Sequence, residues 1–348
     1  MNRLGAVLAV ALVSLLTMAS LAQAQAVTLN GAGASFPFPI YSQWAYKYNQ
    51  LTGVKINYQS IGSGGGIAQI KARTVDFGAS DEPLKPEELE KSGLRQFPMV
   101  MGGVVLVVNL PGIGPGQLRL TGQTMAQIFL GKIAKWDDPA LKELNPKLSL
   151  PSQAITVVHR ADASGTTWIF TSYLDQVSPE WHQKVGAAKA VQWPAPSSVG
   201  GKGNEGVASY VKKIAGSIGY VEYAYALQSR MAYTLLKNRV GFVAPSIETF
   251  QAAAANADWP KARDFYLTLN DEPGEKSWPI AGATYILIYP DQADAQKAKA
   301  MLKYFDWCYR HGGQMAEKLA YVPLPESVVK LVEDSWKEVK AQGKPVWP

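Results

Sequence analysis

The apolar positions of this chain change repeatedly between the spacing of a helix and the spacing of a strand. In residues 38–51, aromatic residues and alanine recur every three or four positions, which predicts an amphipathic helix. Residues 54–59 (VKINYQ) alternate apolar and polar side chains, which predicts a strand. The continuous apolar runs 104–109 (VVLVVN) and 284–289 (TYILIY) are typical of strands that are buried on both faces.

The same rhythm continues in the second half of the chain. Residues 155–160 (ITVVHR) predict a strand that leads into a helix over 166–174, and residues 218–226 (IGYVEYAYA) predict a further strand. Strands that alternate with helices favour parallel, doubly wound sheets. We therefore expect an α/β protein.

The N-terminal residues have the pattern of an export signal. Arg3 precedes a long apolar stretch, and small residues at 22, 24 and 26 form cleavage sites of the secretory type. We expect residues 1–24 to be a signal peptide, cleaved after residue 24 or 26, and the mature protein to lie in the periplasm. Because no cysteine stands at the cleavage site, no lipid anchor is expected.

Composition and charge argue against several functions. A length of 348 residues corresponds to roughly two domains of about 150 residues each. The formal charge is +6, and its basic residues are scattered, so no nucleic-acid partner is expected. Cys308 is the only cysteine, and its helical, apolar surroundings predict a buried, inert thiol. The three histidines form no ligand set, so we expect no metal and no other cofactor.

Four segments share one design, in which a strand ends, small residues or glycine make a turn, and a helix begins. They are GAGASFPFP (31–39), IGSGGG (61–66), ASDEP (79–83) and RADASGTT (160–167). Helix N-termini expose unpaired N–H groups and carry partial positive charge, so they bind anions. Each segment alone is also explained by a serine that caps a helix. Together they predict an anion site, because strand-end loops of such sheets meet at one crevice.

Catalytic motifs are absent at these turns. The glycines of 62–66 lack the spacing of a dinucleotide-binding fingerprint, and residues 201–203 lack the hydroxyl residue of a P-loop. A Ser164–His159 dyad is conceivable. However, adjacent strand residues point to opposite faces, so His159 faces away if Arg160 faces the ligand. Hydrolysis is therefore the weaker interpretation.

A series of motifs, in order along the mature chain, resembles the periplasmic phosphate-binding protein of phosphate ABC transporters. They are LNGAGASFPFPIYSQW, YQSIGSGGGIAQI, VDFGASDEPL, LGKIAKWDDPAL, VVHRADASGTTWIFTSYL, GGKGNEGVASYV and GYVEYAYA. The resemblance implies the two-lobed type II periplasmic binding protein fold, with a mainly parallel sheet in each lobe and a two-strand hinge. It also implies that inorganic phosphate is bound between the lobes without a metal or turnover, by a monomer that delivers it to a membrane permease.

The resemblance also implies the residues of the site. The phosphate ligands would be Ser35, Phe36, Ser63, Asp81, Arg160, Ser164, Gly165 and Thr166. Asp162 would orient Arg160 without contacting the ligand. Ser35 stands where threonine is also common, which keeps the hydroxyl donor, and Gly64 stands where some relatives have a second serine.

Asp81 carries a physical argument of its own. A carboxylate among hydrogen-bond donors repels a fully deprotonated anion, because two acceptors would face each other. It suits a ligand that brings a proton, such as phosphate, and rejects sulfate. The alternative is that Asp81 only caps a helix that begins near Pro83.

The two long apolar strands are the expected connections between the lobes. We expect lobe I to comprise residues 25–100 and 278–348, and lobe II residues 101–277. The segments 31–39, 61–66 and 79–83 would lie in lobe I, and 160–167 would lie in lobe II. Two alternatives remain, a binder of another protonated oxyanion such as arsenate, and a phosphoesterase.

Overall fold

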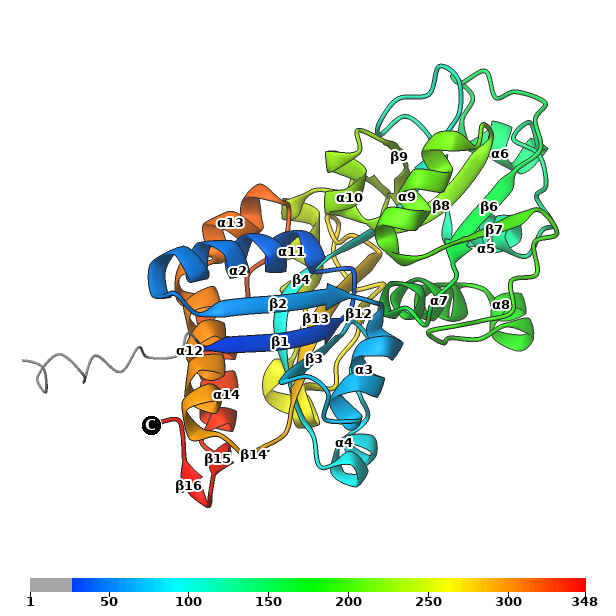
Figure 1. Cartoon of the computed structure of the whole chain (residues 1–348). Helices are drawn as coiled ribbons and strands as arrows, with labels where there is room; N and C mark the ends of the chain where they lie inside the picture. Colours follow the sequence, from blue (N-terminus) through cyan, green and yellow to red (C-terminus); the bar gives the residue numbers. More distant parts are fainter. Residues whose placement is uncertain (1–26) are drawn as a thin grey trace, which may run out of the picture.

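The computed structural model describes residues 27–348 as a mixed α/β fold (Figure 1). The expected signal peptide of residues 1–24 lies outside the described residues. One large sheet runs through the molecule, and its strands follow an order that differs from their order along the chain. That order is β2 (Lys55–Ser60), β1 (Thr28–Gly33), β3 (Phe77–Ser80), β13 (Ile280–Ile288), β4 (Arg95–Val108), β8 (Ser217–Glu222), β6 (Thr156–Arg160) and β7 (Ser198–Gly201).

Parallel pairing occurs at both ends of this order. Strand β1 pairs in parallel with β2 and β3, and β6 pairs in parallel with β7 and β8. The two long strands between them, β13 and β4, are antiparallel to each other and to their outer neighbours. The expected α/β class is therefore confirmed, and the strands from the two apolar runs are the antiparallel centre of the sheet.

Strand β4 belongs to both halves of the sheet. Its residues up to Gly103 pair with β13, and those from Val104 onward pair with β8. The strand begins at Arg95, nine residues before the predicted run. The sequence did not indicate this start, because Pro98 and the two glycines at 102 and 103 interrupt the apolar pattern. The register with β13 shifts where Pro98 lies opposite Tyr285, which accommodates the missing N–H of proline.

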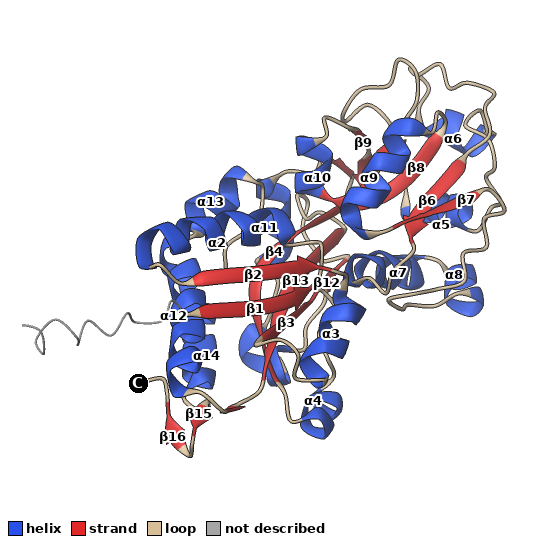
Figure 2. Ribbon diagram, viewed as in Figure 1, coloured by secondary structure: helices blue, strands red, loops and turns tan. Residues whose placement is uncertain are grey.

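We call the part built on β1, β2, β3 and β13 the first region, and the part built on β6, β7 and β8 the second region. Helices pack around both (Figure 2). Those of the first region are α2 (Phe38–Thr52), α3 (Ser63–Lys71), α4 (Pro86–Ser92), α12 (Ala295–His311), α13 (Gly313–Lys318) and α14 (Glu326–Trp336). Those of the second region are α5 (Gly122–Phe129), α6 (Pro139–Leu144), α7 (Gly165–Val177), α8 (Pro179–Lys184), α9 (Gly203–Lys213) and α10 (Tyr223–Gln228).

The remaining elements are short. Helix α11 (Ile247–Ala254) contacts β4 and β13. The others are β5 (Arg119–Leu120), β9 (Ala232–Tyr233), β10 (Leu235–Lys237), β11 (Phe242–Val243), β12 (Leu269–Asn270), β14 (Asp291–Gln292), β15 (Lys340–Ala341), β16 (Lys344–Pro345) and the 3-10 turns η1 (Trp259–Lys261) and η2 (Arg263–Phe265).

The core follows from the apolar periodicity. The helix predicted over 38–51 is α2, and it buries Tyr41, Trp44 and Tyr48 as its spacing required. Cys308 is buried in α12, and burial raises the pKa of its thiol well above its usual value, so it is the inert thiol that we expected.

Candidate anion-binding site

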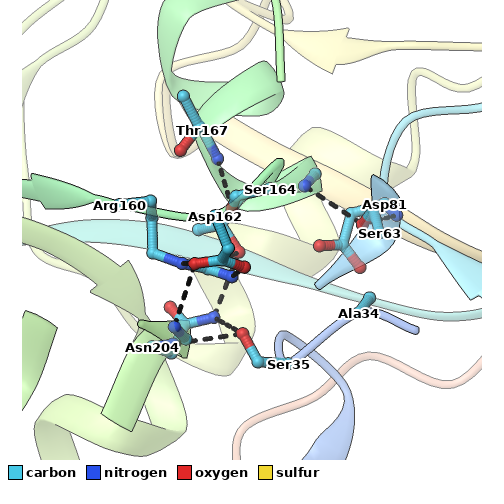
Figure 3. Close-up of polar contacts among 12 residues, drawn as sticks. Ala34, Ser35, Ser63, Asp81, Arg160, Asp162, Ser164, Thr167 and Asn204 are labelled. Atoms are coloured by element: carbon cyan, nitrogen blue, oxygen red, sulfur yellow. Dashed lines mark hydrogen bonds and ion pairs between the residues drawn. The ribbon is translucent and has the colours of Figure 1, made fainter. Parts of the chain in front are cut away.

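The four turn segments meet where the first region contacts the second (Figure 3). Ser35 follows β1, Ser63 begins α3, and Asp81 follows β3, all in the first region. Arg160 ends β6, and Ser164 is the N-cap of α7, both in the second region. Both α3 and α7 begin at this junction, where Gly165 at the start of α7 donates to Ser63 at the start of α3 (Figure 1). The strand–turn–helix design therefore places these side chains at one site.

Direct hydrogen bonds join the two regions around the site. The N–H of Gly165 donates to Ser63 Oγ at 3.0 Å, and the N–H of Gly64 donates to the carbonyl of Ala163 at 2.9 Å. At the rim, Lys189 of the second region pairs with Glu82 of the first. The regions are thus in contact, and the site between them is closed to solvent.

Burial of the polar side chains is nearly complete. Ser63, Ser164 and Thr166 are 0% exposed, and Arg160 is 5% exposed. Buried polar groups cost free energy unless they are hydrogen-bonded, so their partners define what the site can bind.

Three hydroxyl groups each accept two hydrogen bonds from N–H groups. Ser63 Oγ accepts from the N–H groups of Gly165 at 3.0 Å and Asp81 at 3.2 Å. Ser35 Oγ accepts from both the backbone N–H (3.1 Å) and the side-chain amide (2.8 Å) of Asn204.

The third hydroxyl, that of Thr166, accepts from Asn204 Nδ2 at 3.1 Å and from Arg160 Nη1 at 3.3 Å. A hydroxyl has two lone pairs and one proton. Because both lone pairs of each hydroxyl are occupied, its proton is available to donate, and the Thr166 hydroxyl also acts to lower the pKa of Asp81. This arrangement is a set of hydrogen-bond donors suited to an anion.

Arg160 is held by Asp162 in a two-pronged ion pair. Arg160 Nε lies 2.8 Å from Asp162 Oδ1, and Nη2 lies 2.5 Å from Oδ2. The N–H of Gly203 also donates to Asp162 Oδ1 at 3.0 Å. Burial alone raises the pKa of Asp162, but the hydrogen bonds and charge of Arg160 outweigh it, so the net pKa is lowered. Asp162 therefore stays ionised and fixes the plane of the guanidinium.

Asp81 is the exception among these donors. Its side chain is 1% exposed, and neither carboxylate oxygen has a hydrogen-bond partner in residues 27–348. Burial raises its pKa from 3.8 to about 7, although Thr284 and Arg160 act to lower it. The side chain caps no helix, because α4 begins at Pro86 with Lys85 at its N-cap. The interpretation of Asp81 as a helix cap is therefore wrong.

The structure also separates His159 from Ser164. The His159 ring stacks on Trp193 at 5.0 Å between centroids, and its Nδ1 lies 2.9 Å from the carbonyl of Arg160. Ser164 Oγ instead accepts from the N–H of Thr167 at 3.0 Å, as an N-cap. The conceivable Ser164–His159 dyad is thus not formed.

Two glycines allow the regions to approach this closely. A Cβ on Gly165 would lie 2.5 Å from Ser63 Oγ and 2.6 Å from Asp81 Cβ. Gly62 has φ +85°, and a Cβ there would lie 2.3 Å from Asp162 Oδ2. Gly165 is therefore needed for its small size as well as for its N–H.

Sequence reasoning missed several residues of the site. Asn204, at the start of α9, joins Ser35 to Thr166, and its Oδ1 accepts from the N–H of Glu222 at 2.8 Å. Tyr225 donates to the carbonyl of Ser35 at 2.6 Å. The segment GKGNEG that holds Asn204 stood out in the sequence, but nothing there indicated that its amide faces Ser35.

Phe36 is fully buried, and its carbonyl lies 2.6 Å from the hydroxyl of Tyr321.

No group of three or more His, Cys, Asp or Glu residues that could hold a metal ion occurs in the described part of the chain. Among residues 27–348, no helix has the length and apolar character needed to span a bilayer.

Comparisons with known proteins agree with this architecture. The model of the PBP superfamily domain matches residues 19–309. The phosphate-binding protein PstS of Xylella fastidiosa is 57% identical over 321 residues, which cover 92% of this chain and 88% of that protein. The PstS protein of Haemophilus influenzae is 53% identical, with 92% of this chain and 96% of that protein covered.

Solved structures are similar in fold at lower identity. The phosphate-bound periplasmic phosphate-binding protein PfluDING has a TM-score of 0.73 at 20% identity, and 92% of this chain and 96% of that one are covered. The phosphate-binding protein from Stenotrophomonas maltophilia has a TM-score of 0.68 at 21% identity, covering 88% and 93%. The resemblance found in the motifs is thus confirmed, and the chain belongs to the family of PstS phosphate-binding proteins within the PBP superfamily.

Proposed function

We propose that this protein captures inorganic phosphate in the periplasm and delivers it to the permease of an ABC importer, without catalysing a reaction. The ligands would be the hydroxyl and backbone groups of Ser35, Phe36, Ser63, Ser164, Gly165 and Thr166, together with the side chains of Asp81 and Arg160. Asp162 would act only through Arg160. The PstS relatives from Xylella fastidiosa and Haemophilus influenzae are phosphate-binding proteins, which supports phosphate as the ligand.

One observation carries the choice of ligand. In residues 27–348 the Asp81 carboxyl is a buried acceptor without a hydrogen-bond partner, and the groups that act on it include the hydroxyls of Thr284 and Thr166 and the charge of Arg160. A ligand must therefore accept hydrogen bonds from most groups of the site and donate one to Asp81. Phosphate near neutral pH carries a proton, whereas sulfate does not. Where Asp81 is ionised, forcing two acceptors together would cost sulfate roughly a thousandfold in affinity.

The proposed lobes use the same boundaries as the expectation from the sequence. Lobe I would comprise residues 25–100 and 278–348, and lobe II residues 101–277, in the type II arrangement. The passage of β4 from β13 to β8 at Gly103 and Val104 supports a hinge there. Because ligand groups come from both lobes, phosphate would stabilise the closed form that a permease recognises.

Calorimetry in metal-free buffer tests the proposal. We expect tight phosphate binding with a chelator present, and no heat with sulfate. Equal affinity for the two anions would contradict the role of Asp81, and turnover of a phosphomonoester would contradict a purely binding function. Arsenate also carries a proton, so titration with arsenate decides whether the site is specific among protonated oxyanions.

Location and assembly state are part of the same proposal. Residues 1–24 would direct export as a signal peptide and would then be removed by cleavage. The mature protein would work as a monomer without a lipid anchor. Mass spectrometry of protein from a periplasmic extract gives the cleavage site and any lipid. Light scattering at the concentrations used for calorimetry gives the assembly state, and a stable dimer would contradict the proposal.

A further inference from the structure

A second buried carboxyl group, that of Glu222, lies beside the site at the end of β8. It is 0% exposed and makes no ion pair in the part of the chain that the structure describes. In the sheet it lies opposite Val104, the first residue of β4 that pairs with the second region. Glu222 is thus placed where the chain passes from one region to the other.

Glu222 is connected to the anion-binding segment by two routes. Its N–H donates to Asn204 Oδ1 at 2.8 Å, and Asn204 in turn donates twice to Ser35 Oγ. Its Oε2 lies 2.8 Å from the hydroxyl of Tyr321, which lies 2.6 Å from the carbonyl of Phe36. Both routes therefore end on Ser35–Phe36 of the first region.

Counting protons along the second route indicates the state of Glu222. The carbonyl of Phe36 has no proton, and the hydroxyl of Tyr321 has one. Two oxygen–oxygen contacts of 2.6 and 2.8 Å need two protons if both are hydrogen bonds. Tyr321 supplies the first to Phe36, so the second must be on Glu222.

The surroundings favour a neutral Glu222. Burial is the largest influence on its carboxyl and raises its pKa well above the ordinary value, and the charge of Asp81 acts in the same direction. The N–H of Ala224, which donates to Oε2 at 2.9 Å, and the Tyr321 hydroxyl act to lower it. The other titratable groups nearby, Tyr223 and Tyr225, carry no positive charge.

We propose that Glu222 is a positioning residue of the anion site that carries a proton while the two regions are in contact, and that it acts through Tyr321 on Phe36. The proposal rests on the proposed function and adds a residue to it. Tyr225 donates to the carbonyl of Ser35 and so fixes the peptide whose N–H belongs to Phe36. Tyr321 fixes the next carbonyl, and together they aim the Phe36 N–H at the ligand.

Loss of the proton has a defined consequence. An ionised Glu222 attracts the only proton of Tyr321, so the carbonyl of Phe36 loses its donor and faces an oxygen lone pair. The backbone at Phe36 then turns, and its N–H leaves the orientation in which it faces the ligand. Phosphate affinity therefore falls as Glu222 ionises with rising pH.

Infrared difference spectroscopy tests the protonation directly, with and without phosphate. Wild-type protein at neutral pH should show the carbonyl stretch of a buried, protonated carboxyl that Glu222→Gln removes. The matched control is Glu205→Gln, which makes the same side-chain substitution at an exposed position of α9 and should leave that band in place. If Glu222→Gln has the wild-type spectrum in both states, Glu222 is ionised and the proposal fails.

Phosphate titrations test the positioning role. Tyr321→Phe removes the donor to Phe36 and should weaken phosphate binding about fivefold to tenfold. Glu222→Gln cannot ionise, so the ratio of wild-type to Glu222→Gln affinity should fall as pH rises. A constant ratio, or wild-type affinity in Tyr321→Phe, overturns the role.

Two features keep these outcomes separate from other failures. The infrared band does not depend on phosphate, so protein that binds no phosphate would refute the proposed function and leave the protonation of Glu222 measurable. Should Glu222→Gln fail to fold, the ¹³C shift of the Glu222 carboxyl in labelled wild-type protein gives its protonation over the same pH range.

Discussion

Replacing Asp81 with asparagine should remove a pH dependence of stability that the buried carboxyl creates. In the folded protein its pKa is about 7, against an ordinary value of 3.8. Between these values the folded state binds more protons than the unfolded state, so the free energy of unfolding falls as pH rises. Asparagine does not titrate, so the free energy of unfolding of Asp81→Asn should not show this fall.

The size of the effect follows from the separation of the two pKa values. At about 1.4 kcal/mol per pH unit, the interval from 3.8 to about 7 corresponds to about 4 kcal/mol. Relative to wild type, Asp81→Asn should therefore gain little at pH 4 and up to about 4 kcal/mol above pH 7. The constant cost of an unsatisfied amide does not change with pH and drops out of the comparison.

Chemical denaturation of phosphate-free protein between pH 4 and pH 8 measures this difference. A suitable control is Asp291→Asn, which removes the same charge from an exposed side chain. Parallel stability curves for wild type and Asp81→Asn would refute the reasoning, because they would mean that the carboxyl titrates normally in the folded protein.

Three further changes test the site. Gly165→Ala puts a methyl group 2.5 Å from Ser63 Oγ, so phosphate affinity should fall about tenfold or more in calorimetry, while a Gly241→Ala control, with open space around its Cβ, should leave affinity unchanged. Asn204→Ala removes the side-chain amide that donates to Ser35 Oγ and to Thr166 Oγ1, while the backbone N–H that also donates to Ser35 Oγ remains. It should weaken phosphate binding about tenfold, and wild-type affinity would contradict this. Adding a metal chelator should leave phosphate affinity unchanged, and a loss of binding would reveal a metal that the site requires.

The periodicity of the sequence was sufficient to predict the α/β class and many of the elements. Helix α2 and the strand predicted over 54–59 lie close to their expected bounds, because each has a clear apolar period that burial of one face requires. The length of β4 was not predicted, because Pro98 and two glycines interrupt its apolar run. Only pairing with β13, with its shift in register, makes that segment a strand.

The polar residues of the candidate site divide in the same way. The turns with Ser63, Asp81 and Ser164 were recognised because local features, a strand end followed by small residues and a helix, indicate anion binding by themselves. The bare carboxylate of Asp81, in contrast, depends on which groups surround it, and these come from β13 and the second region.

Sequence alone therefore determined the fold class, the family resemblance and the turns that carry the candidate ligands, since these depend on neighbours along the chain. Tertiary structure decided which hydrogen-bonding groups are paired within the protein and which remain available to a ligand. Asn204 occupies the lone pairs of Ser35 from 169 residues away, and Tyr321 reaches Phe36 across 285 residues. Such contacts leave no periodic trace, because a hydrogen bond between distant segments requires only one side chain in the right place.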